Sequence, residues 1–259
     1  MGEPLINPDF IPIVEYAARA NKKVYFYTNA TLLTRDKARA IVAANNVERI
    51  TISLDGAKDS TYEFIRVGAN FSRVIKNIAG LVEERNRQHV SKPYIRIAMV
   101  TTSYNVAEMP ELVLLGKRLG VDEVAATFFK VTVPGLASWI CSPELLRNYS
   151  QEASKIAHQN NIRFNLEFVL PEEQPSALNS KSGPSSKSCL WPWMSINISV
   201  DGSVSPCCYQ PRAEVYGLGN LFETSFDNIW NSPSYKQLRR CLREQNLDGL
   251  PCIDCRDHV

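Results

Sequence analysis

The chain has 259 residues, 44% of them hydrophobic and 22% charged, and its formal net charge is only +2. A chain of this length and composition can form one large domain or two smaller ones whose cores need no disulfides. The charge is too small and too evenly spread for a typical nucleic-acid binder. No apolar run approaches the ~18–20 residues of a membrane span, and the N-terminus lacks the pattern of a signal peptide. We therefore expect a soluble cytoplasmic protein with no nucleic-acid or membrane partner.

Strand-like and helix-like segments alternate over residues 1–170. The spacing of apolar residues predicts five strands, each associated with a helix and joined by short loops. Such repeats form βαβ units whose parallel strands are covered by helices, so we predict an α/β fold. The expected strands are Lys23–Thr28, Arg49–Leu54, Tyr94–Val100, Glu123–Phe129 and Phe164–Leu170, and the expected helices are Pro8–Ala20, Arg35–Asn45, Phe71–Gln88, Pro110–Leu119 and Pro143–Asn160.

Residues 171–188 interrupt this pattern, because they are rich in Pro, Ser, Lys and Glu and contain little to bury. This composition predicts a linker between a domain of residues 1–170 and a small domain of residues 189–259. The small domain should contain a β-hairpin closed by a tight turn, followed by two short helices. The expected hairpin strands are Ser195–Val200 and Ser203–Cys208, the turn is Asp201-Gly202, and the helices are Ser225–Asn231 and Ser234–Glu244.

The cysteines are concentrated near the C-terminus, where six of the seven lie within residues 189–259. An odd number of cysteines argues against a disulfide framework and for a metal or cluster site. Two cysteines flank the predicted hairpin and two form a terminal Cys-x-x-Cys, which together give four thiolates for an iron–sulfur cluster or a structural zinc ion; ligand type alone does not decide between them. The predicted ligands are Cys189, Cys207, Cys252 and Cys255, with Cys208 as an alternative to Cys207, while Cys141 and Cys241 are expected to be packing residues.

Polar residues follow the strands of the predicted parallel sheet. Gly2-Glu3-Pro4 opens the chain, Thr28-Asn29 ends the first strand, and Ser53-Leu54-Asp55-Gly56 ends the second. In a parallel α/β fold these positions share the carboxyl edge of the sheet, where ligands bind. Arg66 follows within reach of that edge. A carboxylate, small polar side chains and one Arg would together suit a nucleoside that carries an amino acid.

These motifs resemble those of the radical S-adenosylmethionine (SAM) enzymes. Met1–Leu5, Thr28–Leu33 and Ile52–Gly56 match that family in order and spacing. The C-terminal cysteines, with Gly219-Asn220-Leu221 and Ile229–Ser232, resemble the auxiliary-cluster domain called SPASM, or its one-cluster form called twitch. The resemblance implies a partial (β/α)6 TIM-like barrel followed by a small cluster domain of a β-hairpin and short helices.

The resemblance also implies roles for individual residues. The Gly-Glu-Pro segment would contact the methionine ammonium of SAM, where a carboxylate makes a charge-assisted hydrogen bond. The end of the second strand would contact the ribose, and one Arg would contact the methionine carboxylate. The four thiolates would hold an auxiliary 4Fe–4S cluster. The implied SAM-binding residues are Gly2, Glu3, Pro4, Thr28, Asn29, Ser53, Asp55 and Arg66, and the implied cluster ligands are Cys189, Cys207, Cys252 and Cys255.

One part of the family pattern is missing. Radical SAM enzymes hold their core cluster with a Cys-x-x-x-Cys-x-x-Cys motif upstream of Gly-Glu-Pro, and this sequence contains no such motif. We therefore expect that the chain is an N-terminally truncated fragment whose barrel lacks its first βα unit. Such a unit has roughly 30 or more residues. As a consequence, this chain alone is expected to be inactive.

The sequence therefore favours a radical SAM/SPASM oxidoreductase. The resemblance implies that a 5′-deoxyadenosyl radical abstracts a hydrogen atom from a peptide, protein or sugar-like small-molecule substrate, and that a ferredoxin or flavodoxin supplies electrons. The cofactors would perform the chemistry while the protein orients them. The alternative is a non-catalytic remnant in which the four cysteines bind zinc or an iron–sulfur cluster structurally.

Overall fold

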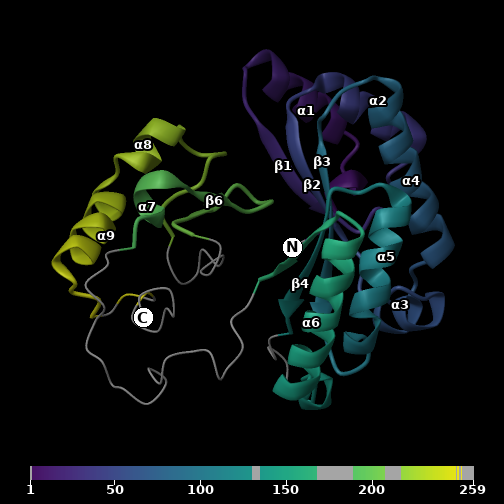
Figure 1. Cartoon of the computed structure of the whole chain (residues 1–259). Helices are drawn as coiled ribbons and strands as arrows, with labels where there is room; N and C mark the ends of the chain where they lie inside the picture. Colours follow the sequence, from purple (N-terminus) through teal and green to yellow (C-terminus); the bar gives the residue numbers. More distant parts are fainter. Residues whose placement is uncertain are drawn as a thin grey trace. The chain divides into compact units, whose positions relative to one another are not determined.

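Figure 1 shows the computed structural model of the chain, which describes residues 2–129, 135–167, 189–207, 217–248, 250 and 252. The chain divides into two compact units, Met1–Gln174 and Pro175–Val259, which we describe separately. The linker predicted at residues 171–188 lies outside the described residues, as do Cys208 and Cys255.

The large unit is built on a five-stranded parallel sheet in which the strands follow one another in chain order. All five carboxyl ends therefore lie at one edge of the sheet, because parallel strands run in the same direction. The strands are β1 (Val24–Thr28), β2 (Val47–Ser53), β3 (Tyr94–Thr101), β4 (Glu123–Phe128) and β5 (Arg163–Leu166).

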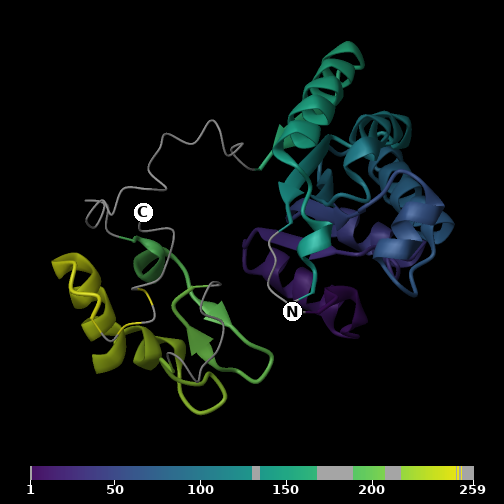
Figure 2. The same cartoon turned by 90° about the horizontal axis from the view of Figure 1, so that it is seen from below.

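Helices pack on one side of this sheet, where α2, α4 and α5 lie together in both views (Figures 1 and 2). Alternate strand residues such as Ile50, Ile52 and Ile97 face this layer and are fully buried, since successive side chains of a strand point to opposite faces. The helices are α1 (Phe10–Arg19), α2 (Arg35–Ala44), α3 (Asp59–Ile65), α4 (Phe71–Arg87), α5 (Met109–Leu119) and α6 (Pro143–Gln159). Among the described residues, no helix is both long enough and apolar enough to cross a membrane.

The α/β prediction is confirmed, and the five strands and five longer helices begin and end within a few residues of their predicted bounds. The short helix α3 was not predicted. It has seven residues, begins with three polar ones and buries only Tyr62, so it shows no apolar periodicity that could have identified it. The last predicted strand ends at Leu166 in the described part, and its residues 168–170 lie outside that part.

The small unit contains the predicted hairpin and both predicted helices, but its regular structure is sparse. The two hairpin strands pair through only two residues each. A short helix, α7, precedes them and was not predicted. The elements are α7 (Trp191–Met194), β6 (Asn197–Ile198), β7 (Val204–Ser205), α8 (Phe226–Trp230) and α9 (Pro233–Glu244). Among the residues of this unit that the structure describes, the buried core consists of Val204, Leu218, Ile229, Tyr235, Leu238 and Leu242.

The hairpin turn depends on Gly202. Its φ is +81°, in the left-handed region that favours glycine, and a Cβ built there would come within 2.5 Å of the Asn220 side-chain oxygen. Asn220 donates to the carbonyl of Asp201 at 2.9 Å. The turn and the Gly-Asn-Leu segment are therefore packed against each other, and a side chain at position 202 would be strained and crowded.

Candidate functional site

The Glu3 carboxylate is held at the carboxyl end of β1 by three hydrogen bonds. Its Oε1 accepts from the Thr28 hydroxyl at 2.6 Å and from the Leu5 amide at 3.1 Å, and its Oε2 accepts from the Asn29 amide at 2.7 Å. Glu3 caps the 3₁₀ turn η1 (Pro4–Ile6), in which Pro4 occupies the first position. Three of the residues predicted to share this edge are thus in direct contact, although Thr28 and Asn29 lie 25 and 26 residues from Glu3 in the sequence. We call this group of hydrogen-bonded residues the Glu3 cluster.

Two side chains that we did not predict hold this cluster in place. Lys37 of α2 donates from Nζ to the Leu5 carbonyl at 2.7 Å, which fixes the turn that follows Glu3. Asn77 of α4 donates to the Ala30 carbonyl at 2.8 Å. Ala30 has a φ of +58°, which is costly for a residue with a Cβ and is retained where neighbouring contacts define it. The loop after β1 is therefore tied to two helices.

Asp55 and Arg66 form a second pair at the same edge, at the end of β2. Arg66 donates from Nε to Asp55 Oδ2 at 2.6 Å, and its Nη2 forms an ion pair with the same oxygen at 2.6 Å. The Val100 amide donates to Asp55 Oδ1 at 2.7 Å. Asp55 is buried with 4% of its surface exposed, whereas the Arg66 side chain retains 30% exposure. A two-point contact between a guanidinium and a carboxylate fixes the orientation of both groups.

The remaining predicted residues of this edge are less constrained. Ser53 is the last residue of β2 and is partly buried, and no partner of its hydroxyl is found in the described ranges. The Asn29 side chain accepts from the amide and hydroxyl of Thr31, at 2.9 and 2.7 Å. Gly2 is exposed, and a Cβ built there would meet nothing within 4 Å. The packing of the chain does not by itself require glycine at position 2.

The cysteines of the small unit are only partly described. Cys189 and Cys252 pack against the core of this unit, and Cys207 follows strand β7. Burial raises the pKa of Tyr235 to about 12, and the nearby Cys207 thiol contributes to this rise. Within the residues that the structure describes, no group of three or more His, Cys, Asp or Glu side chains is arranged to hold a metal ion. Because Cys255 is outside those residues, convergence of the four thiolates remains a prediction.

The amino-acid sequence matches two known protein families. Residues 1–90 match the radical SAM superfamily, and residues 189–256 match the iron–sulfur cluster-binding domain called SPASM. The first match contains the Glu3 cluster and the Asp55–Arg66 pair, and the second contains all four predicted cluster ligands. The chain thus carries a radical SAM segment followed by a SPASM domain. Its two domains imply SAM and iron–sulfur clusters as cofactors.

Curated relatives include a bacteriocin biosynthesis protein and a maturase. The chain is 25% identical to the antilisterial bacteriocin subtilosin biosynthesis protein AlbA of Bacillus subtilis, across 92% of this chain and 49% of AlbA. It is 31% identical to the mycofactocin maturase MftC of Mycobacterium tuberculosis, across 98% of this chain and 61% of MftC. The chain thus spans about half the length of AlbA and less than two thirds of MftC.

Solved radical SAM structures share the fold. Streptococcus suis SuiB superposes with a TM-score of 0.69 at 19% identity, across 92% of this chain and 56% of SuiB. The enzyme anSMEcpe with bound AdoMet (SAM) superposes with a TM-score of 0.61 at 17% identity, across 91% of this chain and 63% of that chain. These similarities confirm the predicted TIM-like α/β architecture of the radical SAM fold.

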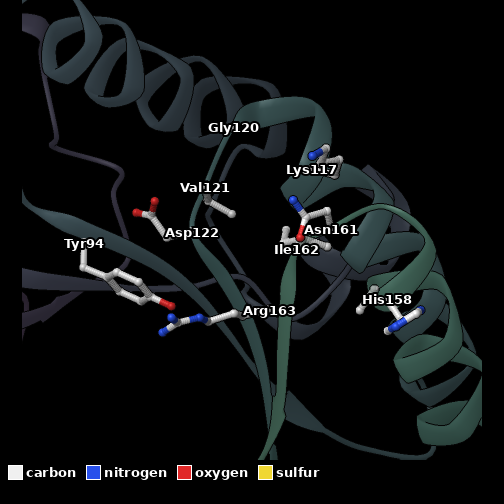
Figure 3. Close-up of a pocket in the computed structure, with 10 residues that line it drawn as sticks. Tyr94, Lys117, Gly120, Val121, Asp122, His158, Asn161, Ile162 and Arg163 are labelled. Carbon is white, nitrogen blue, oxygen red and sulfur yellow. The ribbon is translucent and has the colours of Figure 1, made fainter. Parts of the chain in front are cut away.

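A cavity of 660 Å³ lies at the opposite edge of the sheet, near the amino-terminal ends of β3, β4 and β5 (Figure 3). Arg163 lies over the ring of Tyr94, with 5.8 Å between the guanidinium carbon and the ring centroid. Lys117 and His158 belong to the last turns of α5 and α6, where cations complement the partial negative charge of a helix C-terminus. None of the predicted SAM-binding residues lines this cavity. We therefore assign the candidate site to the carboxyl edge.

Proposed function

We propose that this chain provides the SAM-binding edge and the auxiliary-cluster domain of a radical SAM maturase that modifies a peptide. The observation that supports this most strongly is the Glu3 cluster, in which a carboxylate is fixed at the carboxyl end of β1. The superfamily match over residues 1–90 covers the same residues. The Asp55–Arg66 pair supplies the second group of polar atoms at this edge.

The acceptor capacity of Glu3 fits the methionine ammonium of SAM. An ionised carboxylate has about four acceptor positions. Three of these are used by Leu5, Thr28 and Asn29, which leaves room for one charged donor. Because the three existing bonds fix the carboxylate before the ligand arrives, little side-chain entropy is lost on binding. In this proposal Glu3 binds the ammonium group and Thr28 and Asn29 orient Glu3.

Arg66, Asp55 and Ser53 fit the rest of the ligand. Arg66 uses Nε and Nη2 for Asp55, and no partner of Nη1 is found among the residues described, so Nη1 is available to the methionine carboxylate. Within the described residues, Asp55 Oδ1 accepts only from the Val100 amide, so it can accept from a ribose hydroxyl. The Ser53 hydroxyl can either accept from or donate to a ribose hydroxyl. Because Asp55 and Arg66 are partly or fully buried, such polar contacts are stronger here than they would be in water.

Two cofactors define the proposed chemistry. In this superfamily SAM and a core cluster together supply hydrogen-atom abstraction from the substrate. The sequence contains no Cys-x-x-x-Cys-x-x-Cys, so we propose that the chain by itself binds SAM without cleaving it. In the small unit, Cys189, Cys207, Cys252 and Cys255 would hold the auxiliary cluster, because four thiolates are the usual ligands of such clusters.

A peptide is the substrate class that the comparisons favour. Mycofactocin maturase and a bacteriocin biosynthesis protein are among the relatives, and SuiB was solved with its precursor peptide SuiA bound, with a TM-score of 0.67 to this chain. We further propose that the reaction on that peptide is an oxidoreductase reaction and that a reductant such as ferredoxin or flavodoxin supplies the electrons.

Isothermal titration of the anaerobically reconstituted chain with SAM tests the binding site. We expect saturable binding that Glu3→Gln weakens by about 10-fold or more, because a charge-assisted hydrogen bond contributes roughly 1.5–3 kcal/mol. Glu15→Gln, an exposed carboxylate of α1, is the matched control and should bind as the unchanged chain does. Absence of SAM binding, or equal binding by Glu3→Gln, would contradict the proposal.

A second measurement separates the enzyme fragment from a structural metal protein. With dithionite as reductant, this chain should release no 5′-deoxyadenosine, while iron analysis should show an iron–sulfur cluster. Release of 5′-deoxyadenosine would show that the chain cleaves SAM. Stoichiometric zinc without iron, combined with no SAM binding, would instead support the non-catalytic alternative.

A further inference from the structure

The side-chain amide of Asn105 connects the loop after β3 to the end of β2. It is fully buried, and its Nδ2 donates to the carbonyls of Asp55 and Val100, at 3.0 and 2.9 Å. Its Oδ1 accepts from the amide and hydroxyl of Thr102, at 2.7 and 3.1 Å. All four hydrogen-bonding positions of the amide are therefore used. This single side chain joins two adjacent strand ends at the candidate site.

Glu108 makes a second connection between the same two loops. It belongs to the turn η2 (Val106–Glu108), and its carboxylate accepts from the amides of Ala57 and Lys58, at 2.7 and 3.2 Å, and from the Thr61 hydroxyl at 2.5 Å. Only 7% of its surface is exposed. The two amides lie just before α3, where backbone N–H groups have no partner within the helix, so Glu108 satisfies them from outside.

These contacts hold the first part of the segment that runs from Asp55 to Arg66. Asp55 precedes the loop that Glu108 binds, and Arg66 is the residue at which α3 ends. Gly56 allows the loop to pass close to α3, since a Cβ there would lie 2.9 Å from the Tyr62 amide nitrogen. The position of the Arg66 guanidinium therefore depends on where Glu108 fixes the start of α3 and on where Asn105 and Val100 fix Asp55.

We propose that Asn105 and Glu108 are positioning residues for SAM binding, an inference that rests on the proposed function. The Asn105 amide has no hydrogen-bonding position left for the ligand. The hydrogen bonds of Glu108 hold it against the loop before α3 and the first turn of that helix. They act through Asp55 and Arg66, which they fix in the binding geometry before SAM arrives. Preorganisation of this kind improves affinity because the ordering cost is not incurred during binding.

SAM titration of Glu108→Gln and Asn105→Ser tests this inference. Glu108→Gln preserves the shape but weakens the hydrogen bonds to the loop, and we expect the SAM dissociation constant to rise by about 10-fold, the effect of one charge-assisted hydrogen bond. Asn46→Ser is the matched control, because Asn46 also donates to two carbonyls, of Val14 and Lys22, at 3.0 and 3.1 Å. This control should lower the melting temperature without changing the dissociation constant.

A double-variant cycle shows whether Glu108 acts through Arg66. If it does, Glu108→Gln should have little further effect on SAM affinity in an Arg66→Lys background, so the two effects should not add. Additive effects would overturn the inference, as would unchanged SAM affinity in both positioning variants. If Asn105→Ser does not fold, Glu108→Gln and the cycle decide alone. Failure of the unchanged chain to bind SAM would contradict the proposed function instead.

Discussion

The two units of this chain are stabilised in different ways. In the large unit, the core extends across the sheet and the helices that cover it. In the described part of the small unit, six residues form the buried core and the hairpin strands pair through two residues each. A core that small supplies little of the free energy that a domain needs, and small domains commonly rely on metals or other cross-links. We therefore expect the large unit to be stabilised mainly by apolar burial and the small unit to depend more on specific polar contacts and on the proposed cluster.

Arg239 is a charged residue that holds several elements of the small unit together. Its guanidinium carbon lies 4.2 Å from the ring centroid of Trp230 and 4.3 Å from that of Tyr235. It also donates to the carbonyls of Pro192 and Trp230, at 2.9 and 2.8 Å. One side chain thus connects α7, α8 and α9. Stacking of a cation on aromatic rings and hydrogen bonds from a charged group both stabilise this contact.

Loss of the proposed iron–sulfur cluster should have the largest effect on stability, and that effect should be confined to the small unit. We expect Cys189→Ser or Cys252→Ser to reduce bound iron from about four atoms per chain to near background, because a site needs its full thiolate set. The small unit should then lose its ordered structure, since metal-binding free energy becomes folding free energy in such domains. Iron analysis and tryptophan fluorescence measure this, because three of the four tryptophans, Trp191, Trp193 and Trp230, lie in the small unit.

Cys241→Ser is the control for this experiment, because Cys241 belongs to α9 and is outside the predicted ligand set. It should retain iron. Far-ultraviolet circular dichroism should show that the helices of the large unit persist in every variant. Unfolding of both units together on iron loss would contradict the comparison.

Arg239→Ala should have the second-largest effect. The variant loses two hydrogen bonds from a charged donor and two ring contacts, so we expect the free energy of unfolding of the small unit to fall by about 2–4 kcal/mol. Denaturant titration followed by tryptophan fluorescence measures this. Arg240→Ala, an exposed neighbour on α9, should change it little. Equal effects of the two substitutions would show that Arg239 is not a central contact.

The smallest effect should be a pH dependence confined to the large unit. Hydrogen bonds from Arg87 and then Arg35 lower the pKa of the buried Glu84 carboxyl below its usual 4.5. A carboxyl whose pKa is lowered on folding stabilises the fold above its unfolded pKa, and this contribution is lost as the pH falls through the folded pKa. The large unit should therefore lose more stability between pH 7 and pH 4 than its Glu84→Gln variant does.

Denaturant titrations at the two pH values measure this difference. Glu83→Gln is the control, since Glu83 pairs with the same Arg35 at 3.1 Å but its side chain is 61% exposed. Exposed pairs contribute little because water screens them. The interpretation would be wrong if Glu84→Gln and the unchanged chain lost stability equally.

The sequence predicted the parts of this molecule that follow from local pattern and topology. Strands β1 to β5 were identified because short β-branched runs alternate with amphipathic helices. The placement of Glu3, Thr28 and Asn29 at one edge followed from the common carboxyl edge of parallel strands, although their direct contact was not predicted. The pairing of Arg66 with Asp55 was not predicted, because both residues were assigned to the ligand and nothing in the sequence shows that they meet each other.

The supporting residues could not be predicted for a related reason. Lys37, Asn77, Asn105 and Glu108 bind backbone groups that are 32 to 51 positions away in the chain. Such bonds depend on how loops pack after the strands have assembled, and a polar residue in a helix or loop has no periodicity that indicates its partner. Helix α3, which leads to Arg66, was also not predicted, because its seven residues are too few to show an apolar periodicity.

The connections made by Asn105 and Glu108 also have a consequence for local opening of the molecule. The amides of Ala57, Lys58, Val100 and Thr102 are donors to the side chains of Glu108, Asp55 and Asn105, so none of them can separate from its acceptor unless the joined loops move together. Regions linked in this way open as one cooperative unit. These four amides should therefore exchange hydrogen for deuterium with a common protection factor, distinct from that of the small-unit hairpin.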